Sequence, residues 1–335
     1  MSVEKNILVT GGSGFIGSAF CRFLHRSKKF KIIILDKLTY ASNKNSINEI
    51  LEDKNVKFFK GSIGNKTLVQ DLLKSFTPTY IVNFAAETHV DNSISNPDSF
   101  IQTNIVDTHN FFKIILNFYK DLNKIDRLKF RFLQISTDEV YGDIDFDKEP
   151  VNETAPYRPS SPYSATKAAG DHLVKAYFRT FDFPGIISNC SNNYGPFQHH
   201  EKFIPKVITS VLNKKKIPIY GNGKQVRDWI YVDDHCNALI DLINNGQPGE
   251  NYNIGNGNEI TNIDVVKTIL TTLKSFSLIN NNNIKHYVNF VDDRLGHDRR
   301  YSIDSTKIRK LSDWKSKTNF ETGIELTISS MLQIN

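Results

Sequence analysis

Two clusters of residues in the middle of this chain carry side chains that can move protons. Tyr163 and Lys167 stand four positions apart, so on a helix they share one face. A neighbouring ammonium favours phenolate and lowers the phenol pKa from about 10. Thr137, Asp138 and Glu139 place a hydroxyl beside two carboxyl groups. Adjacent carboxylates repel and burial raises both pKa values, so one protonated acid beside one ionised base is predicted.

Both clusters also have a plain structural interpretation. Tyr-x-x-x-Lys occurs often by chance on a protein surface, and Thr-Asp-Glu can simply begin a helix because acidic residues are favoured there. The sequence around both clusters favours a catalytic role for them. A nucleotide-binding motif precedes both clusters, and Thr137 follows an apolar run at the carboxyl end of a predicted strand, where sites form in open α/β sheets.

That earlier motif is a glycine loop. Gly11, Gly14 and Gly17 are spaced three apart, between an apolar strand at residues 7–10 and a helical stretch from Phe15. Glycine lets backbone N–H groups approach a pyrophosphate at the start of the next helix. A merely structural turn is the alternative, but the strand and helix around the loop predict a dinucleotide site.

Asp36 ends the second strand, about 20 residues beyond the loop. A carboxylate there binds ribose hydroxyls and repels a 2′-phosphate, so NAD is favoured over NADP. Lys37 tempers this preference, because a cation can accommodate the phosphate. A plain capping role for Asp36 is the alternative.

The elements that position these residues alternate between strand and helix. Strands are predicted at residues 7–10, 32–35, 56–59, 80–84 and 130–135, with helices at 66–76 and 97–120. This order predicts an α/β fold: a doubly wound parallel Rossmann sheet with a smaller C-terminal α/β lobe. We place the nucleotide-binding domain at residues 1–190, with a return at about 226–250, and the second lobe mainly at 191–335.

Composition excludes several classes of protein. The 335 residues are 39% hydrophobic, with no run near the ~20 apolar residues of a membrane helix and no signal-peptide pattern, so we expect a cytoplasmic enzyme. Cys21, Cys190 and Cys236 lack metal-ligand spacing and are predicted to be reduced packing residues; no metal site is expected. The net charge of +6 comes without a nucleic-acid module and implies only a mild attraction for an anionic nucleotide.

Several motifs together carry a family resemblance. The glycine loop with Tyr163 and Lys167 resembles the extended short-chain dehydrogenase/reductase family. Thr137-Asp138-Glu139, with the segments at 189–196, 227–229 and 296–301, is similar to the nucleoside-diphosphate-glucose 4,6-dehydratases. The resemblance runs from Ile7 to about Trp314.

The resemblance implies a hydro-lyase that uses one tightly bound NAD, regenerated in each turnover. Tyr163, assisted by Thr137 and Lys167, would take the C4 hydroxyl proton as hydride leaves C4. Glu139 would then remove the C5 proton while Asp138 protonates the departing C6 hydroxyl. Hydride return to C6 would give the 4-keto-6-deoxy sugar.

The resemblance also implies a set of cofactor contacts: Gly11, Gly14, Phe15, Ile16, Gly17, Asp36, Lys37, Leu38, Thr39, Ser62, Ile63, Ala85, Ala86, His89, Thr103, Tyr163, Lys167 and Asn193. Ser62 departs from the family, which usually presents Asp to the adenine amino group. A hydroxyl still forms a hydrogen bond, so an altered adenine contact is expected.

The implied nucleotide-sugar contacts are His89, Thr137, Asn192, Glu201, Lys202, Phe203, Pro218, Tyr220, Arg227, Asn262, Arg294 and His297. Arg227 and Arg294 are the natural diphosphate ligands, because a guanidinium fork matches phosphate oxygens. Leu295 stands where the family generally has Pro, which puts the loop conformation near the phosphates in doubt.

The substrate is expected to be dTDP-glucose, in a deoxysugar pathway of the rhamnose type, with UDP-glucose as the alternative. A nucleotide-sugar 4-epimerase is a second alternative, which needs no acid and base pair at C5 and C6, and a non-catalytic NAD-binding protein is a third. A homodimer is implied, through helices at 103–119 and 163–181. The apolar stripe of Phe111, Phe112, Ile115 and Phe118 suits such an interface and equally suits ordinary core packing.

Overall fold

The computed structural model describes residues 5–334. A seven-stranded sheet of order β10-β6-β5-β4-β1-β2-β3 forms its centre, and every strand pair in it is parallel. This confirms the predicted doubly wound sheet. The strands are β1 (Lys5–Thr10), β2 (Phe30–Asp36), β3 (Val56–Lys60), β4 (Tyr80–Asn83), β5 (Arg131–Thr137), β6 (Gly185–Cys190) and β10 (Asn251–Ile254).

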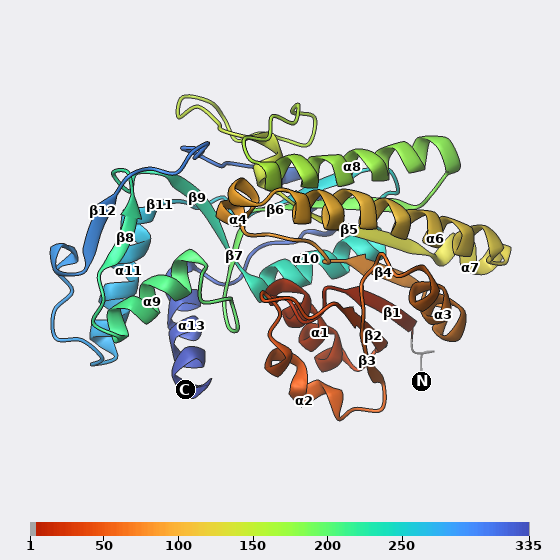
Figure 1. Ribbon diagram of the computed structural model, residues 1–335, viewed down its shortest axis with the longest axis horizontal. Coiled ribbons are helices and arrows are strands. Elements are labelled where there is room, and N and C mark those ends of the chain that lie inside the picture. Colours follow the sequence, from red (N-terminus) through yellow and green to blue (C-terminus); the bar gives the residue numbers. More distant parts are fainter. Residues whose placement is uncertain (1–4, 335) are drawn as a thin grey trace.

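Helices cover both faces of this sheet (Figure 1). One face packs on α1 (Phe15–Ser27), α10 (Val232–Asn245) and α12 (Thr306–Ser312). The other packs on α3 (Lys66–Phe76), α6 (Thr108–Asp121) and α8 (Pro162–Phe181). The strands are apolar on both sides because both faces are covered. Shorter helices are η1 (Lys44–Ile47), α2 (Asn48–Leu51), α4 (Val90–Ser95), α7 (Lys124–Lys129) and η3 (Asp138–Tyr141).

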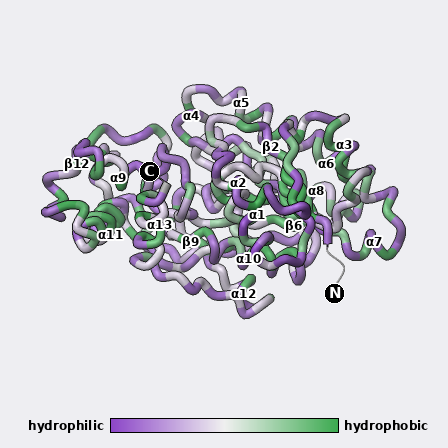
Figure 2. Tube along the Cα trace, turned by 90° about the horizontal axis from the view of Figure 1, so that it is seen from below, coloured by the Kyte–Doolittle hydropathy of each residue, from purple (hydrophilic) through white to green (hydrophobic). Residues whose placement is uncertain are grey.

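A smaller lobe lies beside the sheet (Figure 2). It holds two small sheets and its own apolar core. One sheet joins β7 (Asn192–Tyr194), β9 (Val226–Tyr231) and β11 (Glu259–Thr261), and the other joins β8 (Ile217–Tyr220) and β12 (Val288–Val291). The helices of the lobe are α9 (Phe203–Leu212), α11 (Asn262–Ser275), η4 (Ile284–His286) and α13 (Phe320–Ile334).

The domain boundaries at 190 and 226–250 stay a prediction. Two features bear on them. Helix α10 packs in the same core as α1, while β9 pairs with β7 and β11 in the smaller lobe. The edge strand β10 then returns to pair with β6. The chain therefore passes between the two lobes more than once.

The helix predicted at residues 97–120 is interrupted. It consists of α5 (Asp98–Phe100), a π-helical segment η2 (Ile101–Asp107) and then α6. Phe111, Phe112 and Ile115 on α6 are fully buried against the sheet. Phe118, the fourth member of the stripe, is partly buried and packs against the same core. Core packing is therefore the correct interpretation for Phe111, Phe112 and Ile115, and these three side chains are not available to a dimer interface.

Within residues 5–334, no helix combines the length and the apolar character needed to cross a membrane. Cys21, Cys190 and Cys236 are all buried and free, as predicted for packing residues.

Candidate active site

The glycine loop forms the floor of a cavity of about 280 Å³ at the carboxyl edge of the sheet. Gly11 has φ +68°, and a Cβ there would lie 2.7 Å from the backbone nitrogen of Ala85. A Cβ on Gly17 would collide with the carbonyl oxygen of Gly11. Only glycine allows these close approaches. They leave the backbone of the glycine loop, directly before α1, free to approach a ligand, which is the cradle that a pyrophosphate requires.

Asp36 ties the glycine loop to β2. Its Oδ2 accepts from the backbone N–H of Ser13 at 2.8 Å, and its Oδ1 accepts from Leu38 N at 2.7 Å and Ser42 Oγ at 2.9 Å. A carboxylate has about four acceptor positions, so capacity for a ribose hydroxyl remains. Asp36 lines the cavity, and the site fits an adenosine ribose without a 2′-phosphate.

Almost all of the predicted cofactor residues come together around this cavity. Leu38 is the exception: its backbone, at φ +59°, supports Asp36, and the residue does not line the cavity. The predicted residues that do are Gly11, Gly14, Phe15, Ile16, Gly17, Asp36, Lys37, Thr39, Ser62, Ile63, Ala85, Ala86, His89, Thr103, Tyr163, Lys167 and Asn193.

Ser62, the departure noted in the sequence, has an acidic neighbour. Its Oγ donates to Asp107 Oδ2 at 3.4 Å, and Asp107 also accepts from Gln102 at 2.8 Å. A carboxylate therefore lies behind the Ser62 hydroxyl, at the end of η2.

Thr137, Asp138 and Glu139 stand where β5 ends and η3 begins. Thr137 Oγ1 accepts from Glu139 N at 3.3 Å and donates to Asp138 Oδ1 at 3.2 Å. Asp138 is 3% exposed, and its Oδ2 has no hydrogen-bond partner among the described residues. Burial, and next the charge of Glu139, raise the pKa of Asp138 well above its usual range. The neutral acid is thereby favoured.

Glu139 has a different environment. Burial raises its pKa, but the positive charges of Lys202, Arg227 and Arg294 act to lower it. Arg227 also acts to lower the pKa of Asp138, but burial and the charge of Glu139 outweigh it. The two adjacent carboxyl groups are therefore driven apart in acidity, with Asp138 suited to give a proton and Glu139 suited to take one.

Tyr163 and Lys167 share the buried face of α8, as predicted. The predicted lowering of the Tyr163 pKa is wrong for the protein alone. Burial, followed by the charge of Glu139, raises that pKa well above 10, and the hydrogen bond with Thr137 lowers it only in part. Lys167 Nζ donates to the carbonyl oxygen of Ile135 at 2.6 Å, so its ammonium is held by the end of β5.

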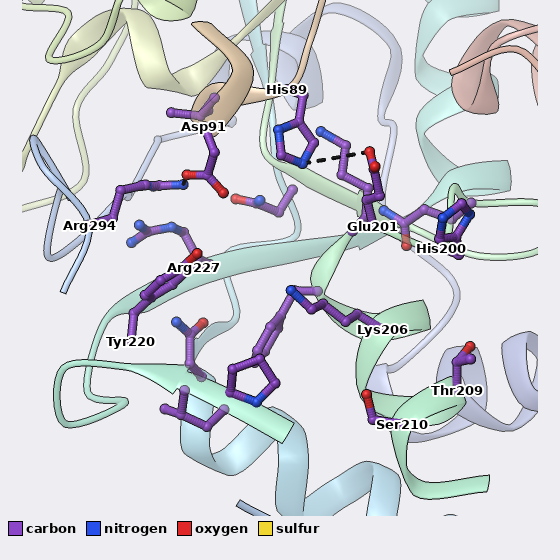
Figure 3. A pocket seen from close by; sticks show the side chains of 18 of the residues that line it. His89, Asp91, His200, Glu201, Lys206, Thr209, Ser210, Tyr220, Arg227 and Arg294 are labelled. Atoms are coloured by element: carbon purple, nitrogen blue, oxygen red, sulfur yellow. Dashed lines mark hydrogen bonds and ion pairs between the residues drawn. The ribbon is translucent and has the colours of Figure 1, made fainter. Parts of the chain in front are cut away.

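A second cavity, of about 580 Å³, adjoins the first and extends into the smaller lobe (Figure 3). It collects the predicted nucleotide-sugar residues His89, Asn192, Glu201, Lys202, Phe203, Pro218, Tyr220, Arg227, Asn262, Arg294 and His297. Thr137 is the exception, because it lines the first cavity instead. Glu139 lines both cavities, so the acid and base pair stands where they meet.

The two predicted diphosphate ligands are held differently. Arg227 donates to the carbonyl oxygens of Val226 at 2.7 Å and Asp298 at 2.8 Å, and its guanidinium lies 4.0 Å from the ring centre of Tyr301. Arg294 contacts Asp91 at 3.4 Å, while its buried Nε has no partner within residues 5–334. Arg294 thus keeps donor capacity facing the cavity.

Sequence reasoning missed several lining residues: Asp91, Gln198, His199, His200, Lys206 and Tyr301. A usable signal existed for most of them. Asp91 lies two residues after His89, and Gln198 to His200 directly precede Glu201. Lys206 lies one helical turn beyond Lys202, so its side chain points to the same side of α9.

Comparison with known proteins matches residues 8–327 to the family described as GDP-mannose 4,6 dehydratase. The chain belongs to this family. Curated relatives include the dTDP-glucose 4,6-dehydratase of Haemophilus influenzae, 44% identical over 96% of this chain and 96% of the relative. Another is the dTDP-glucose 4,6-dehydratase of Escherichia coli, 44% identical over 96% and 92%.

Solved structures agree with this membership. A dTDP-glucose 4,6-dehydratase from Bacillus anthracis in complex with NAD is 39% identical, with a TM-score of 0.86 over 98% of this chain and 97% of that one. The dTDP-glucose 4,6-dehydratase from Streptomyces venezuelae, with NAD and dTDP bound, is 36% identical, with a TM-score of 0.88 over the same shares. Epimerases are also similar, among them the UDP-glucose 4-epimerase of Thermotoga maritima, 25% identical with a TM-score of 0.85 over 98% and 99%.

Proposed function

We propose that this chain converts dTDP-glucose to dTDP-4-keto-6-deoxyglucose, with NAD held in the smaller cavity and the nucleotide sugar in the larger one. The observation that carries the proposal is the adjacent pair of buried Asp138 and partly exposed Glu139, with unequal environments, beside Tyr163 at the junction of the cavities. The dehydratase relatives at 44% identity support it.

When bound, NAD would supply the acceptor and later the donor of hydride. Tyr163 would accept the C4 hydroxyl proton. Because burial raises its pKa, the phenolate needs added positive charge, and the residue one turn away that can provide it is Lys167. The positively charged ring of oxidised NAD would add a second positive charge beside Tyr163.

The elimination step would use the two carboxyl groups at the end of β5. A ketone at C4 acidifies the C5 hydrogen, and Glu139 takes that proton as general base. Asp138, favoured in its neutral form, donates a proton to the C6 hydroxyl, which leaves as water. Return of the proton from Glu139 to C5 and of hydride to C6 would complete the product and restore the Glu139 carboxylate. Tyr163 would then hold the proton of the C4 hydroxyl while Asp138 is ionised, so transfer of one proton from Tyr163 to Asp138 through solvent would complete the cycle.

The proposal is tested by assaying the loss of water from each candidate nucleotide sugar. Purified protein is incubated with dTDP-glucose, and separately with UDP-glucose, without added NAD, and products are followed by mass spectrometry. Loss of one water supports the dehydratase, and the ratio of kcat/KM values decides between the two nucleotides. If neither sugar reacts even with NAD supplied, the proposal fails.

Asp138 and Glu139 also distinguish this reaction from 4-epimerisation, which removes no proton from C5. Glu139→Gln should keep nucleotide binding and C4 oxidation but stop water loss. Full turnover by that variant would overturn the assignment of the base.

The final sugar is proposed to serve a deoxysugar pathway of the rhamnose type.

We also propose that the active form is a cytoplasmic homodimer, formed along η2, α6 and α8. With the phenylalanine stripe buried, the support comes from large apolar side chains left exposed on these elements: Ile101 at 46%, Val106 at 41% and Phe181 at 41%. Sedimentation giving only a species of about 38 kDa would exclude the dimer, and Ile101→Asp with Val106→Asp should convert a dimer to monomer.

A further inference from the structure

Three potential metal ligands meet at the junction of the two cavities, in the loop between β7 and α9. The ligand atoms of His199, His200 and Glu201 all lie within 4.8 Å of one another. His199 Nδ1 is 3.5 Å from Glu201 Oε2. From the opposite wall, His89 Nε2 lies 3.8 Å from the same oxygen (Figure 3).

These separations are close to those of a bound ion. Zinc bonds nitrogen and oxygen at about 2.0–2.2 Å, so two ligands of a tetrahedral site lie about 3.4 Å apart. The contact between His199 Nδ1 and Glu201 Oε2, at 3.5 Å, is only slightly longer. Imidazole with carboxylate is also a ligand set that suits zinc and its first-row neighbours.

The position of the cluster makes it accessible to an ion and places it against both cavities. His199 lines the smaller cavity, His200 the larger one, and Glu201 both. Glu201 is 40% exposed at its side chain, so an ion reaches it without opening the core. Lys202 lies next along the chain, and its Nζ donates to the carbonyl oxygen of Thr88 at 3.1 Å.

We propose that His199, His200 and Glu201 form a binding site for a divalent transition-metal ion such as Zn²⁺, and that an ion bound there excludes the nucleotide sugar. His89 is not a ligand, because its Nδ1 accepts from Asn92 N at 3.3 Å and the hydrogen of the neutral ring is therefore on Nε2, facing Glu201. The second half of this proposal rests on the proposed function, because Glu201 is also a proposed sugar contact. The first half stands on the ligand geometry alone.

Binding is tested with Co²⁺ on the untagged full-length protein, by its visible absorption and by calorimetry. We expect one ion per chain, with the intense absorption of a tetrahedral site. His200→Ala, and separately His199→Gln, should each weaken binding at least tenfold, since even an indirect metal partner is worth about 10–100-fold. His286→Ala is the matched control, because His286 is exposed and lines neither cavity.

Equal affinity for Co²⁺ in the wild type and both histidine variants would overturn the site, provided that circular dichroism shows all proteins folded. For the consequence, Zn²⁺ should raise the KM for dTDP-glucose, and EDTA should reverse the effect. An unchanged KM at saturating Zn²⁺ would overturn the exclusion. An absence of metal-free turnover would instead count against the proposed function, so the two failures are distinguishable.

Discussion

At the scale of single residues, the acidity of Glu139 is set by nearby charge. Lys202 is the first of three cations that lower its pKa against the effect of burial. Replacing Lys202 with Met removes this charge, so the pKa of Glu139 rises and more of the base is protonated at a given pH. We therefore expect the acid limb of the kcat profile to move to higher pH, measured from pH 5 to 9. Lys206→Met is the control, because Lys206 lines the same cavity, whereas the cations that lower the pKa of Glu139 are Lys202, Arg227 and Arg294.

The proposed role of Asp138 as the general acid gives a second prediction. Its raised pKa keeps a proton available for the leaving hydroxyl, and an amide cannot supply one. Asp138→Asn should slow water loss by about 10²–10⁴-fold, while C4 oxidation continues. Absorbance of reduced nicotinamide near 340 nm should then accumulate in a single turnover. Water loss at the wild-type rate would show that Asp138 is not the acid.

Single residues also show how much of the candidate site the sequence predicts. The positions of Tyr163, Lys167, Asp138 and Glu139 at one site followed from motif spacing and from the end of a parallel strand. The direction of the Tyr163 pKa did not, because the surroundings of a side chain depend on the whole fold: burial and the charge of Glu139 raise that pKa.

At the scale of elements, the π-helical segment η2 was beyond prediction, because its extra residue per turn is supported by tertiary contacts and not by local pattern. Asn104, on this segment, accepts from Glu87 N at 2.8 Å and donates to Glu87 O at 3.0 Å and Thr166 Oγ1 at 2.9 Å. Glu87 lines the smaller cavity, and Thr166 lies between Tyr163 and Lys167. One side chain thus joins the loop after β4, which lines the smaller cavity, to α8, which carries Tyr163 and Lys167.

Asn104→Ala should leave these buried groups without partners, which costs about 1–3 kcal/mol of unfolding free energy and weakens NAD binding. Denaturant unfolding and NAD titration measure the two effects. Gln102→Ala on the same segment is exposed, and it should change stability by no more than about 0.5 kcal/mol. Unchanged stability and NAD affinity in Asn104→Ala would contradict the role of η2.

At the scale of the whole molecule, the two lobes meet at a buried histidine. His235 on α10 is 0% exposed, and its Nδ1 is 2.9 Å from Asn193 Oδ1 on β7. Because Asn193 donates its own amide to Ser191, Nδ1 of His235 carries the hydrogen, and the ring is neutral. Burial lowers the pKa of His235 to about 3, so the contact between the lobes depends on an uncharged ring.

This histidine makes the molecule sensitive to acid. The unfolded chain binds a proton at His235 below a pKa of about 6.5, whereas the folded protein does not until about pH 3, so stability is present above pH 6.5 and is lost as pH falls. From pH 7 to pH 5 the loss is about 2 kcal/mol. His235→Asn keeps a donor toward Asn193 and cannot titrate, so the difference in unfolding free energy between wild type and variant should change by that amount over this range. A difference that stays constant from pH 7 to pH 5 would mean that His235 is protonated, or exposed, in the folded protein.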